Sequence, residues 1–356
     1  MSEVRAKKAL GQHFLVDLNI ARKIRDALSG GVRPEAGAET RAVAAGSADA
    51  DAETRTRVAG YAGAGAEART MAAGSADAGA EARTKATGTA DADAETRRGV
   101  AASADARLAA DTTAAGAPAA AEEERSGAVP CDVLEVGCGM GVLTQFLLRR
   151  GDITTYGAEI DPESVEYLHA HFPEFAPRLI EGDFLKMNLR ERFPRGLKII
   201  GNFPYNISSQ IFFKVLEHRD LVPECVGMIQ KEVAVRIAEP PGSKEYGILS
   251  VLLQAWYDIE YLFTVNETVF NPPPKVKSAV IRLRRNSVGR LGCDEALFVK
   301  VVKASFGQRR KMIRNSLRAV FGDFGGAEHP FFTQRAEQLS VADFVQLTDW
   351  VAANRK

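Results

Sequence analysis

The run Asn202-Phe-Pro-Tyr205 is the group of residues whose types and order point most directly to a reaction. The amino group of adenine is a poor nucleophile because its lone pair is delocalised into the ring. A site that methylates this group must accept hydrogen bonds from both amine hydrogens and turn the nitrogen toward the methyl donor. The side-chain oxygen of Asn202 and a backbone carbonyl beside the rigid Pro204 can do this, and Tyr205 can stack on the base. These three residues are therefore predicted to be catalytic.

A glycine-rich run is predicted to hold the cofactor. Gly137, Gly139 and Gly141 follow an apolar segment at 131–136 and precede a helical pattern. Glycines in such a turn let the backbone curve tightly and approach a ligand closely. A dinucleotide site has the spacing Gly-x-Gly-x-x-Gly, whereas this run reads Gly-x-Gly-x-Gly with Glu135 before it. The spacing is more typical of S-adenosylmethionine, which we expect as cofactor; a nicotinamide oxidoreductase is the less favoured alternative.

Acidic residues at the ends of the next two predicted strands are candidates for contacts with a bound nucleoside. Glu159 ends the second strand and can accept hydrogen bonds from both ribose hydroxyls. Asp161 can instead cap the helix that Pro162 opens. Asp183 follows the third strand and can accept a hydrogen bond from the exocyclic amine of an adenine. We therefore predict that Glu159 and Asp183 bind the cofactor.

These residues need a scaffold that brings strand ends together, and the hydrophobic pattern predicts one. Apolar runs alternate with helical periodicity after residue 129, which indicates a Rossmann-like, doubly wound and largely parallel α/β sheet. Ligands of such sheets bind beyond the carboxyl ends of the strands. The expected strands are 131–136, 155–160, 178–180, 197–200, 225–229, 257–264 and 279–283, with helices at 19–28, 142–150, 163–171, 208–216 and 232–238. From residue 294 onward the pattern is helical throughout, which predicts a small all-helical domain.

A long low-complexity insertion divides the chain. Residues 33–128 consist mainly of Ala, Gly, Thr, Asp, Glu and Arg with almost no large apolar side chain, and a unit of 14 residues recurs from Gly46. Such units have no apolar face to bury, so disorder is expected. Because the insertion enters at the amino end of the first strand, we expect it to be dispensable for methyl transfer. The predicted domains are 1–32, an arm and helix that cover the cofactor; 33–128, the insertion; 129–288, the methyltransferase domain; and 289–356, a helical RNA-binding domain.

The formal net charge of zero hides a basic segment. The whole chain has 46 basic and 46 acidic residues, but the insertion carries a net charge of −5, so the remainder carries +5. Residues 271–318 hold 13 basic and only 2 acidic side chains. Such concentration of positive charge favours a polyanionic partner, and nucleic acid is the first choice.

The cysteines and the apolar runs indicate the cellular compartment in which we expect the protein. The four cysteines are widely spaced without metal-ligand spacing, so we expect neither a zinc site nor a disulfide framework. The N-terminus has no apolar signal core, and the longest mainly apolar run, 246–257, is too short and too polar to span a bilayer. We therefore expect a cytoplasmic protein that binds neither membrane nor metal.

Together with Lys-Lys-Ala-Leu-Gly-Gln-His-Phe-Leu at 7–15, these motifs resemble the ribosomal RNA adenine N6-dimethyltransferases, above all the bacterial enzymes of the small subunit. Further similarity lies at 230–236, 270–278, 306–311 and 314–317, and the resemblance covers residues 5–31 and about 129–350. Phe203 stands where this family usually has an aliphatic residue, and His13 where it often has Asn.

The resemblance implies a substrate and a set of roles. The substrate is a pair of adjacent adenosines in the 3′-terminal hairpin loop of 16S ribosomal RNA, dimethylated during ribosome biogenesis, and single-stranded loops are where bases can be flipped out. Phe270 would sandwich the flipped adenine against Tyr205. The implied cofactor residues are His13, Leu15, Gly137, Glu159, Asp183 and Asn202. The implied RNA-binding residues are Lys275, Lys277, Arg309, Arg310, Lys311 and Arg314, and a monomer acting on the small subunit or its precursor is expected.

Two alternatives within RNA biology stay open. A methyltransferase that modifies large-subunit RNA and confers antibiotic resistance shares the cofactor and adenine motifs, although the runs at 270–278 and 306–311 favour the small-subunit type. A non-catalytic ribosome assembly factor on the same fold is the other alternative, and the intact Asn202, Pro204 and Tyr205 argue against it.

Overall fold

The computed structural model describes residues 4, 7, 10–30 and 130–355. The insertion at 33–128 lies outside these residues, so the predictions that it is disordered and dispensable are not tested by the structure. The described residues belong to one compact unit, in which the N-terminal residues pack with residues 130–355.

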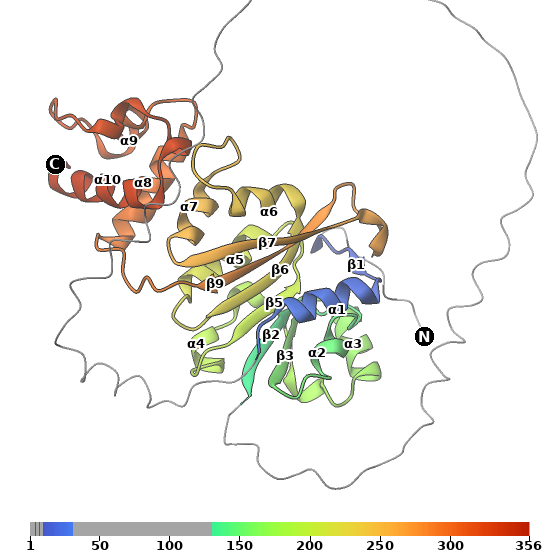
Figure 1. Cartoon of the computed structure of the whole chain (residues 1–356). Helices are drawn as coiled ribbons and strands as arrows, with labels where there is room; N and C mark the ends of the chain where they lie inside the picture. The colour runs from blue at the N-terminus through green and yellow to red at the C-terminus, as the bar shows by residue number, and fades with distance from the viewer. Residues whose placement is uncertain (1–3, 5–6, 8–9, 31–129, 356) are drawn as a thin grey trace, which may run out of the picture. The chain divides into compact units, whose positions relative to one another are not determined.

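The described part of the chain is built around a seven-stranded sheet with the order β4-β3-β2-β5-β6-β9-β7 (Figure 1). The first five strands in this order pair in parallel, whereas β9 is antiparallel to both of its neighbours. The predicted α/β sheet is thus confirmed, with one reversed strand near its edge. The strands are β2 (Cys131–Val136), β3 (Ile153–Glu159), β4 (Leu179–Glu181), β5 (Lys198–Asn202), β6 (Glu224–Gln230), β7 (Tyr257–Val265) and β9 (Ser278–Arg285).

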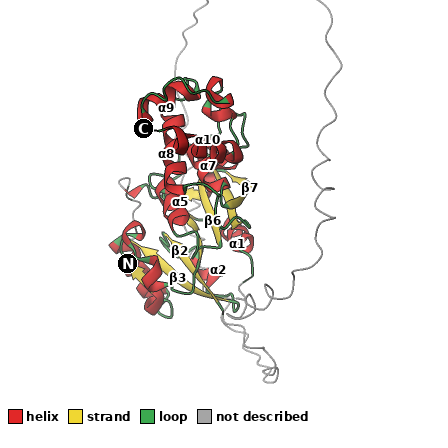
Figure 2. Ribbon diagram, turned by 90° about the vertical axis from the view of Figure 1, so that its left-hand side faces the viewer, coloured by secondary structure: helices red, strands yellow, loops and turns green. Residues whose placement is uncertain are grey.

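Successive residues of each strand face opposite sides of the sheet, and this alternation creates two apolar layers. Val133 packs in one buried cluster with the helix α1 (Leu18–Ala27), whereas Leu134 packs in the other with α5 (Ser208–Glu217). Figure 2 shows α1 and α5 on opposite sides of the strands. Both faces of the central strands are therefore covered, as the near-continuous apolar sequence of a parallel sheet requires.

The remaining helices differ from the sequence prediction in several places. The expected helix 142–150 is reduced to α2 (Thr144–Leu147), and the apolar run 246–257 contains a buried helix, α7 (Ile248–Gln254). The others are α3 (Pro162–His171), α4 (Leu189–Arg192), α6 (Lys231–Ala238), α8 (Glu295–Gly307), α9 (Ile313–Phe321) and α10 (Val341–Asn354).

The C-terminal part is not helical throughout, which corrects the prediction. Between α9 and α10 there are only two short 3₁₀ helices, Pro330–Thr333 and Ala336–Gln338. Gly322, Gly325 and Gly326 take positive φ angles of 83°, 64° and 87°, a conformation that ends a right-handed helix.

Packing connects this part to the sheet domain. Trp256 meets Phe298 of α8 edge to face, with ring centroids 6.0 Å apart, and both belong to one buried cluster. Arg219 lies over Trp256 at 4.5 Å and bonds Glu295 at 2.5 Å. The interface therefore combines an aromatic contact with a charged one.

A two-stranded ribbon joins the N-terminal arm to the loop before β9. In it β1 (Phe14–Leu15) pairs antiparallel with β8 (Phe270–Asn271), so that Leu15 faces Phe270. The Val16 amide adds a hydrogen bond to the Val269 carbonyl at 2.9 Å. Asp17 then caps α1 by accepting from the amides of Asn19 and Ile20. The sequence motif at 7–15 is thereby held against the sheet.

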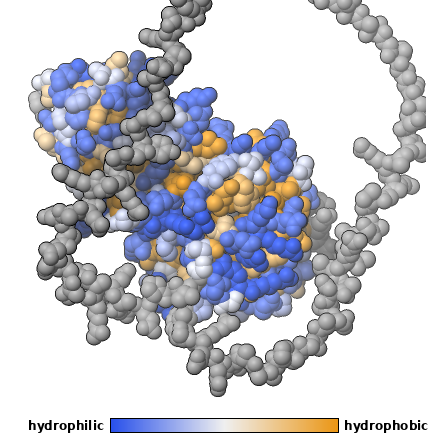
Figure 3. Space-filling model, viewed as in Figure 1, coloured by the Kyte–Doolittle hydropathy of each residue, from blue (hydrophilic) through white to orange (hydrophobic). Residues whose placement is uncertain are grey.

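The surface of the described residues carries both hydrophilic and apolar side chains. Figure 3 shows hydrophilic residues over much of the face in view, with apolar residues gathered in patches between them. Within the described ranges, no helix is both long enough and apolar enough to cross a membrane.

Candidate active site

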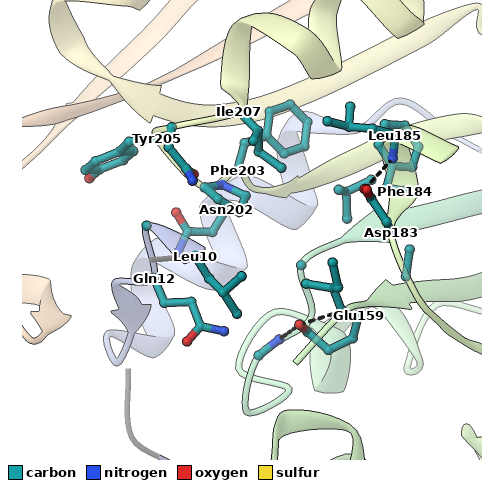
Figure 4. A pocket seen from close by; sticks show the side chains of 18 of the residues that line it. Leu10, Gln12, Glu159, Asp183, Phe184, Leu185, Asn202, Phe203, Tyr205 and Ile207 are labelled. Atoms are coloured by element: carbon teal, nitrogen blue, oxygen red, sulfur yellow. Dashed lines mark hydrogen bonds between the residues drawn. The ribbon is translucent and has the colours of Figure 1, made fainter. Parts of the chain in front are cut away.

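A pocket lies where the ends of β2, β3, β4 and β5 meet the N-terminal arm. It contains about 930 Å³ of space outside protein atoms, including open solvent at its mouth. Figure 4 shows Tyr205 and Asn202 at one end, Glu159 at another and Leu10 between them. The lining comprises residues 10–14, 136, 137, 139, 158–160, 182–185 and 202–207.

The glycine turn after β2 takes the conformation that its sequence predicts. Gly137, Gly139 and Gly141 have φ angles of 78°, 53° and 75°, which favour glycine over any residue with a Cβ. A Cβ on Gly139 would lie 3.0 Å from the Phe14 ring, and one on Gly141 would lie 2.4 Å from the Phe172 ring. The backbone therefore curves into the space beside the arm, and Gly137 and Gly139 line the pocket.

Glu159 is 4% exposed and accepts three backbone hydrogen bonds at the end of β3. Its Oε2 accepts from the Gly139 amide at 2.8 Å, and its Oε1 accepts from the amides of Ile160 and Asp161 at 2.9 Å. Burial raises the pKa of this carboxyl, although the backbone hydrogen bonds oppose the change. The carboxylate thus fixes the glycine turn and still lines the pocket, where it can meet ligand hydroxyls.

Asp161 has the capping role that the sequence predicts. It is the N-cap of α3, where its Oδ2 accepts from the Ser164 amide at 3.3 Å and from the Ser164 hydroxyl at 2.9 Å. Burial opposes ionisation, but the hydrogen bonds from Lys7 and Ser164 outweigh it, so that the pKa of Asp161 is lowered.

Asp183 follows β4 and lines the same pocket. Its Oδ1 accepts from the Leu185 amide at 2.9 Å, and its side chain is 28% exposed. This bond orients the carboxylate at the pocket wall, with Phe184 and Leu185 beside it (Figure 4).

Asn202 ends β5, and its amide is held by the arm. The side-chain Nδ2 donates to the His13 carbonyl at 2.9 Å. Since the nitrogen end of the amide is engaged, the oxygen end is the part of Asn202 that is free to turn to a ligand donor.

Tyr205 is held from two sides. Its hydroxyl is 2.5 Å from the Ser278 hydroxyl, and its ring centroid is 5.2 Å from that of His13, with the planes tilted by 32°. Burial raises the pKa of the Tyr205 phenol. The Nδ1 of His13 donates in turn to the Pro272 carbonyl at 2.9 Å. Tyr205 and His13 thus form a fixed pair of rings at the pocket.

Phe203 is accommodated by glycines on neighbouring strands. It is 1% exposed, and its ring lies where a Cβ on Gly227 would come within 2.5 Å. A Cβ on Gly201 would meet the Val136 carbonyl at 2.5 Å and the same ring at 3.0 Å. The two glycines therefore provide the space that an aromatic residue needs at this position.

Two of the residues predicted to be catalytic or to bind the cofactor lie outside the pocket lining. Phe270 is 3% exposed and Leu15 is 4% exposed, and both are part of the apolar cluster beneath the β1–β8 ribbon. Leu15 instead borders a smaller hollow beside Gly137 and Asn202. The ribbon pairing directs both side chains into the core, which sequence spacing alone does not reveal.

Several residues of the site were not predicted as site residues. Leu10, Gln12, Ile160 and Leu185 line the pocket, and their proximity follows from the folding of the arm over the sheet edge. Within the described residues, no group of three His, Cys, Asp or Glu side chains is placed to hold a metal ion.

Glu135, which precedes the glycines, is the penultimate residue of β2. It is 1% exposed and accepts from the Thr144 hydroxyl at 2.6 Å. Burial raises its pKa to about 8. A neutral carboxyl therefore lies beneath the glycine turn at neutral pH.

The six basic residues expected to bind RNA fall into two groups. Arg309 donates to the carbonyl oxygens of Lys244 and Tyr246, and Arg314 bonds Glu328 at 2.5 Å and lies 5.8 Å from the centre of the Phe332 ring. The other four side chains are exposed and make no ion pair with the described residues: Lys275, Lys277, Arg310 and Lys311.

The pocket lining suits a nucleoside. Ile160 and Phe184 provide apolar walls, whereas Glu159 and Asp183 provide acceptors at separate strand ends. These acceptors therefore fit S-adenosylmethionine, whose ribose hydroxyls and adenine amine are donors.

Comparison with known proteins identifies the family. Residues 130–353 match the family described as ribosomal RNA adenine dimethylase. A relative from Parabacteroides distasonis, named ribosomal RNA small subunit methyltransferase A, is 61% identical over 218 residues, which are 61% of this chain and 81% of the relative. A relative of the same name from Bacteroides thetaiotaomicron is 59% identical over 221 residues, 62% of this chain and 82% of its own length.

A solved structure agrees with these relatives. The crystal structure of a dimethyladenosine transferase from Plasmodium falciparum has a TM-score of 0.53 and 25% sequence identity, and the match covers 63% of this chain and 90% of that one. Because the matched family covers more than half of the chain, this protein belongs to the ribosomal RNA adenine dimethylase family.

Proposed function

We propose that the protein transfers methyl groups from S-adenosylmethionine to the N6 amines of two adjacent adenosines in the 3′-terminal hairpin loop of 16S ribosomal RNA. The observation that carries this proposal is the amide of Asn202, whose nitrogen is bound to the His13 carbonyl at 2.9 Å. Its oxygen is thereby presented as an acceptor beside the pocket that Asn202 lines. An adenine amine is the donor that this acceptor fits.

The residues of the chain would act by orientation and electrostatics. S-adenosylmethionine, when bound, supplies an electrophilic methyl group on a sulfonium. Asn202 Oδ1 accepts one hydrogen of the target amine. The Pro204 carbonyl accepts from the Ile207 amide at 3.2 Å, so we assign the second amine hydrogen to the carbonyl of Phe203. Two fixed acceptors draw the nitrogen lone pair out of conjugation and hold it toward the donor.

The cofactor would be held by the strand ends and the arm. Glu159 accepts from the ribose hydroxyls, Asp183 accepts from the adenine amine, and Gly137 and His13 border the tail. Leu15 supports this site from the core beside it.

Tyr205 would stack on the target adenine, because its ring lies at the pocket and its hydroxyl is fixed by Ser278. Stacking by Phe270 stays a prediction. It requires the ring to leave the cluster in which it is 3% exposed.

The RNA partner would be the small ribosomal subunit or its precursor, bound by a monomer. Lys275, Lys277, Arg310 and Lys311 are exposed cations that can meet phosphates. We keep 129–288 as the methyltransferase domain and 289–356 as the helical RNA-binding domain in this proposal.

The test uses the full chain, S-adenosylmethionine and small ribosomal particles that lack adenine dimethylation. Mass spectrometry of the digested RNA should find N6,N6-dimethyladenosine at two adjacent positions near the 3′ end. Asn202→Ala should slow product formation by at least about 100-fold while RNA binding is retained. Asn19→Ala, an exposed asparagine on α1, is the control and should keep full activity.

The proposal fails if cofactor binds and no dimethyladenosine forms in the particles. Product in large-subunit RNA alone would support the antibiotic-resistance alternative. RNA binding with equal, undetectable activity in wild type and Asn202→Ala would support the assembly factor.

A further inference from the structure

The N-terminal arm forms one wall of the candidate pocket, through residues 10–14. At its inner end the arm is fixed to the sheet, because the His13 carbonyl accepts from Asn202 and β1 pairs with β8. Farther out along the arm, the described residue Lys7 ties it to α3, because its side chain pairs with Asp161 and Glu163.

Lys7 makes contacts with both its side chain and its backbone. Its Nζ forms an ion pair with Asp161, which is 0% exposed, and a second one with Glu163 at 3.0 Å. Its amide donates to Gln12 Oε1 at 2.8 Å, and its carbonyl accepts from the Leu10 amide at 3.0 Å. Leu10 and Gln12 both line the pocket, so the same lysine shapes the lining turn and ties it to α3.

One partner of Lys7, Asp161, belongs to the turn that follows Glu159, and the other, Glu163, lies in the first turn of α3. The Asp161 amide donates to Glu159 Oε1 at 2.9 Å, and Asp161 caps α3. The arm is therefore joined to the strand end that the proposed cofactor contacts. The ion pair also matters electrostatically, because removing one partner of a buried charge leaves the other uncompensated. The hydrogen bonds to Asp161 and then to Glu163 raise the pKa of Lys7, so they favour the charged form of the lysine.

We propose that Lys7 is a positioning residue of the cofactor site, which closes the arm over S-adenosylmethionine by pairing with Asp161 and Glu163 and so slows its release. The inference rests on the proposed function only for the identity of the cofactor. The lysine does not touch the reacting atoms; it acts through Leu10, Gln12 and the turn after β3.

Lys7→Met is the first variant, since it keeps much of the length and removes the charge. Release of S-adenosylmethionine and of its demethylated product is measured by stopped-flow fluorescence, and affinity by calorimetry. We expect the dissociation rate to rise about five- to tenfold and the association rate to change about twofold or less, because interface changes act mainly on dissociation. Lys244→Met, whose side chain is 89% exposed, is the matched control and should leave both rates unchanged.

Glu163→Gln tests the same contact without leaving Asp161 unpaired. The Glu163 side chain is 51% exposed, so we expect a smaller rise in the dissociation rate, about two- to threefold, that disappears in high salt. In the Lys7→Met background, Glu163→Gln should add nothing. Lys7→Arg should restore slow release. If Lys7→Met does not fold, Glu163→Gln and Lys7→Arg decide the matter.

The possible outcomes separate the proposal about Lys7 from the proposed function. A folded Lys7→Met protein that releases cofactor at the wild-type rate overturns the proposal. A wild-type protein that binds no S-adenosylmethionine contradicts the proposed function instead. Slower turnover of the variant with an unchanged release rate would show that Lys7 acts on the RNA side.

Discussion

At the residue scale, the site is built from polar side chains that hydrogen bonds within the protein already hold in place. Asn202 presents its oxygen because its nitrogen is bound to His13, and Glu159 lines the pocket while three amides hold it. Such preorganisation removes the need to reorient polar groups during a reaction. Glu135 lies beneath the same turn and differs from the others because burial raises its pKa to about 8.

The charge state of Glu135 predicts a pH dependence of stability. In the unfolded chain this carboxyl ionises near its model-compound value of 4.5, whereas in the fold it keeps its proton to about pH 8. The unfolded state therefore binds fewer protons between these limits, and the free energy of unfolding should fall as the pH rises through them. The loss should be a few kcal/mol and should end above about pH 8.

Glu135→Gln should remove this part of the pH dependence, because its amide can still accept from Thr144 and cannot ionise. Urea unfolding at pH 5–9 would measure it. Glu166→Gln, an exposed carboxylate on α3, is the control and should follow the wild type. An unchanged slope in Glu135→Gln would mean that the carboxyl is already ionised in the fold at neutral pH.

At the scale of elements, the turn after β5 depends on two glycines in adjacent strands. Phe203 lies against Gly201 of β5 and Gly227 of β6, at distances that leave no space for a Cβ. The Phe203 amide also donates to the Met228 carbonyl at 3.0 Å. The position of Asn202 and Tyr205 thus depends on how this one ring is packed.

Gly227→Ala should destabilise the protein by about 1–3 kcal/mol, because the new methyl group overlaps the Phe203 ring. Phe203→Leu in the same chain should recover most of this loss, since leucine lacks the Cε2 and Cζ atoms that the methyl would meet at 2.5 and 3.3 Å, and its Cδ atoms can turn away. Gly201→Ala should not be rescued by Phe203→Leu, because its Cβ also meets the Val136 carbonyl at 2.5 Å. Urea unfolding of the single and double variants measures the coupling, and equal rescue of both glycine variants would contradict this account.

At the scale of the whole molecule, the basic residues separate into structural and exposed cations. The sequence concentrates 13 basic residues at 271–318, but Arg309 and Arg314 are engaged by backbone carbonyls and by Glu328. Only exposed cations can displace counterions from RNA without losing a partner.

The two groups should respond differently to removal of charge. Gln at Lys275, Lys277, Arg310 or Lys311 should each weaken RNA binding and lower the slope of log affinity against log salt by about 0.7–0.9, with no effect on unfolding. Gln at Arg309 should instead lower the free energy of unfolding by about 1–2 kcal/mol. Binding titrations at several salt concentrations, together with urea unfolding, would check this. If Arg309→Gln lowered the slope of log affinity against log salt by the same amount as the other four variants and kept normal stability, Arg309 would be assigned to RNA binding.

The sequence by itself determined the class of fold, the order of most elements and the family. Local signals suffice for these: the apolar run before Gly137, the cap at Asp161 and the run Asn202-Phe-Pro-Tyr205 each follow from residue type and spacing. The observed sheet order places the ends of β2, β3, β4 and β5 around one pocket, as ligand binding beyond strand ends predicts.

Only the tertiary structure decided which side chains meet across long separations in the chain. The reversal of β9, the burial of Phe270 and Leu15, the bond between Asn202 and His13, and the pairing of Lys7 with Asp161 all join segments far apart in sequence. Periodicity reports on neighbours along an element, whereas these contacts depend on how elements pack against one another. For the same reason, a stretch that is uniformly basic in sequence can contain both structural arginines and free cations.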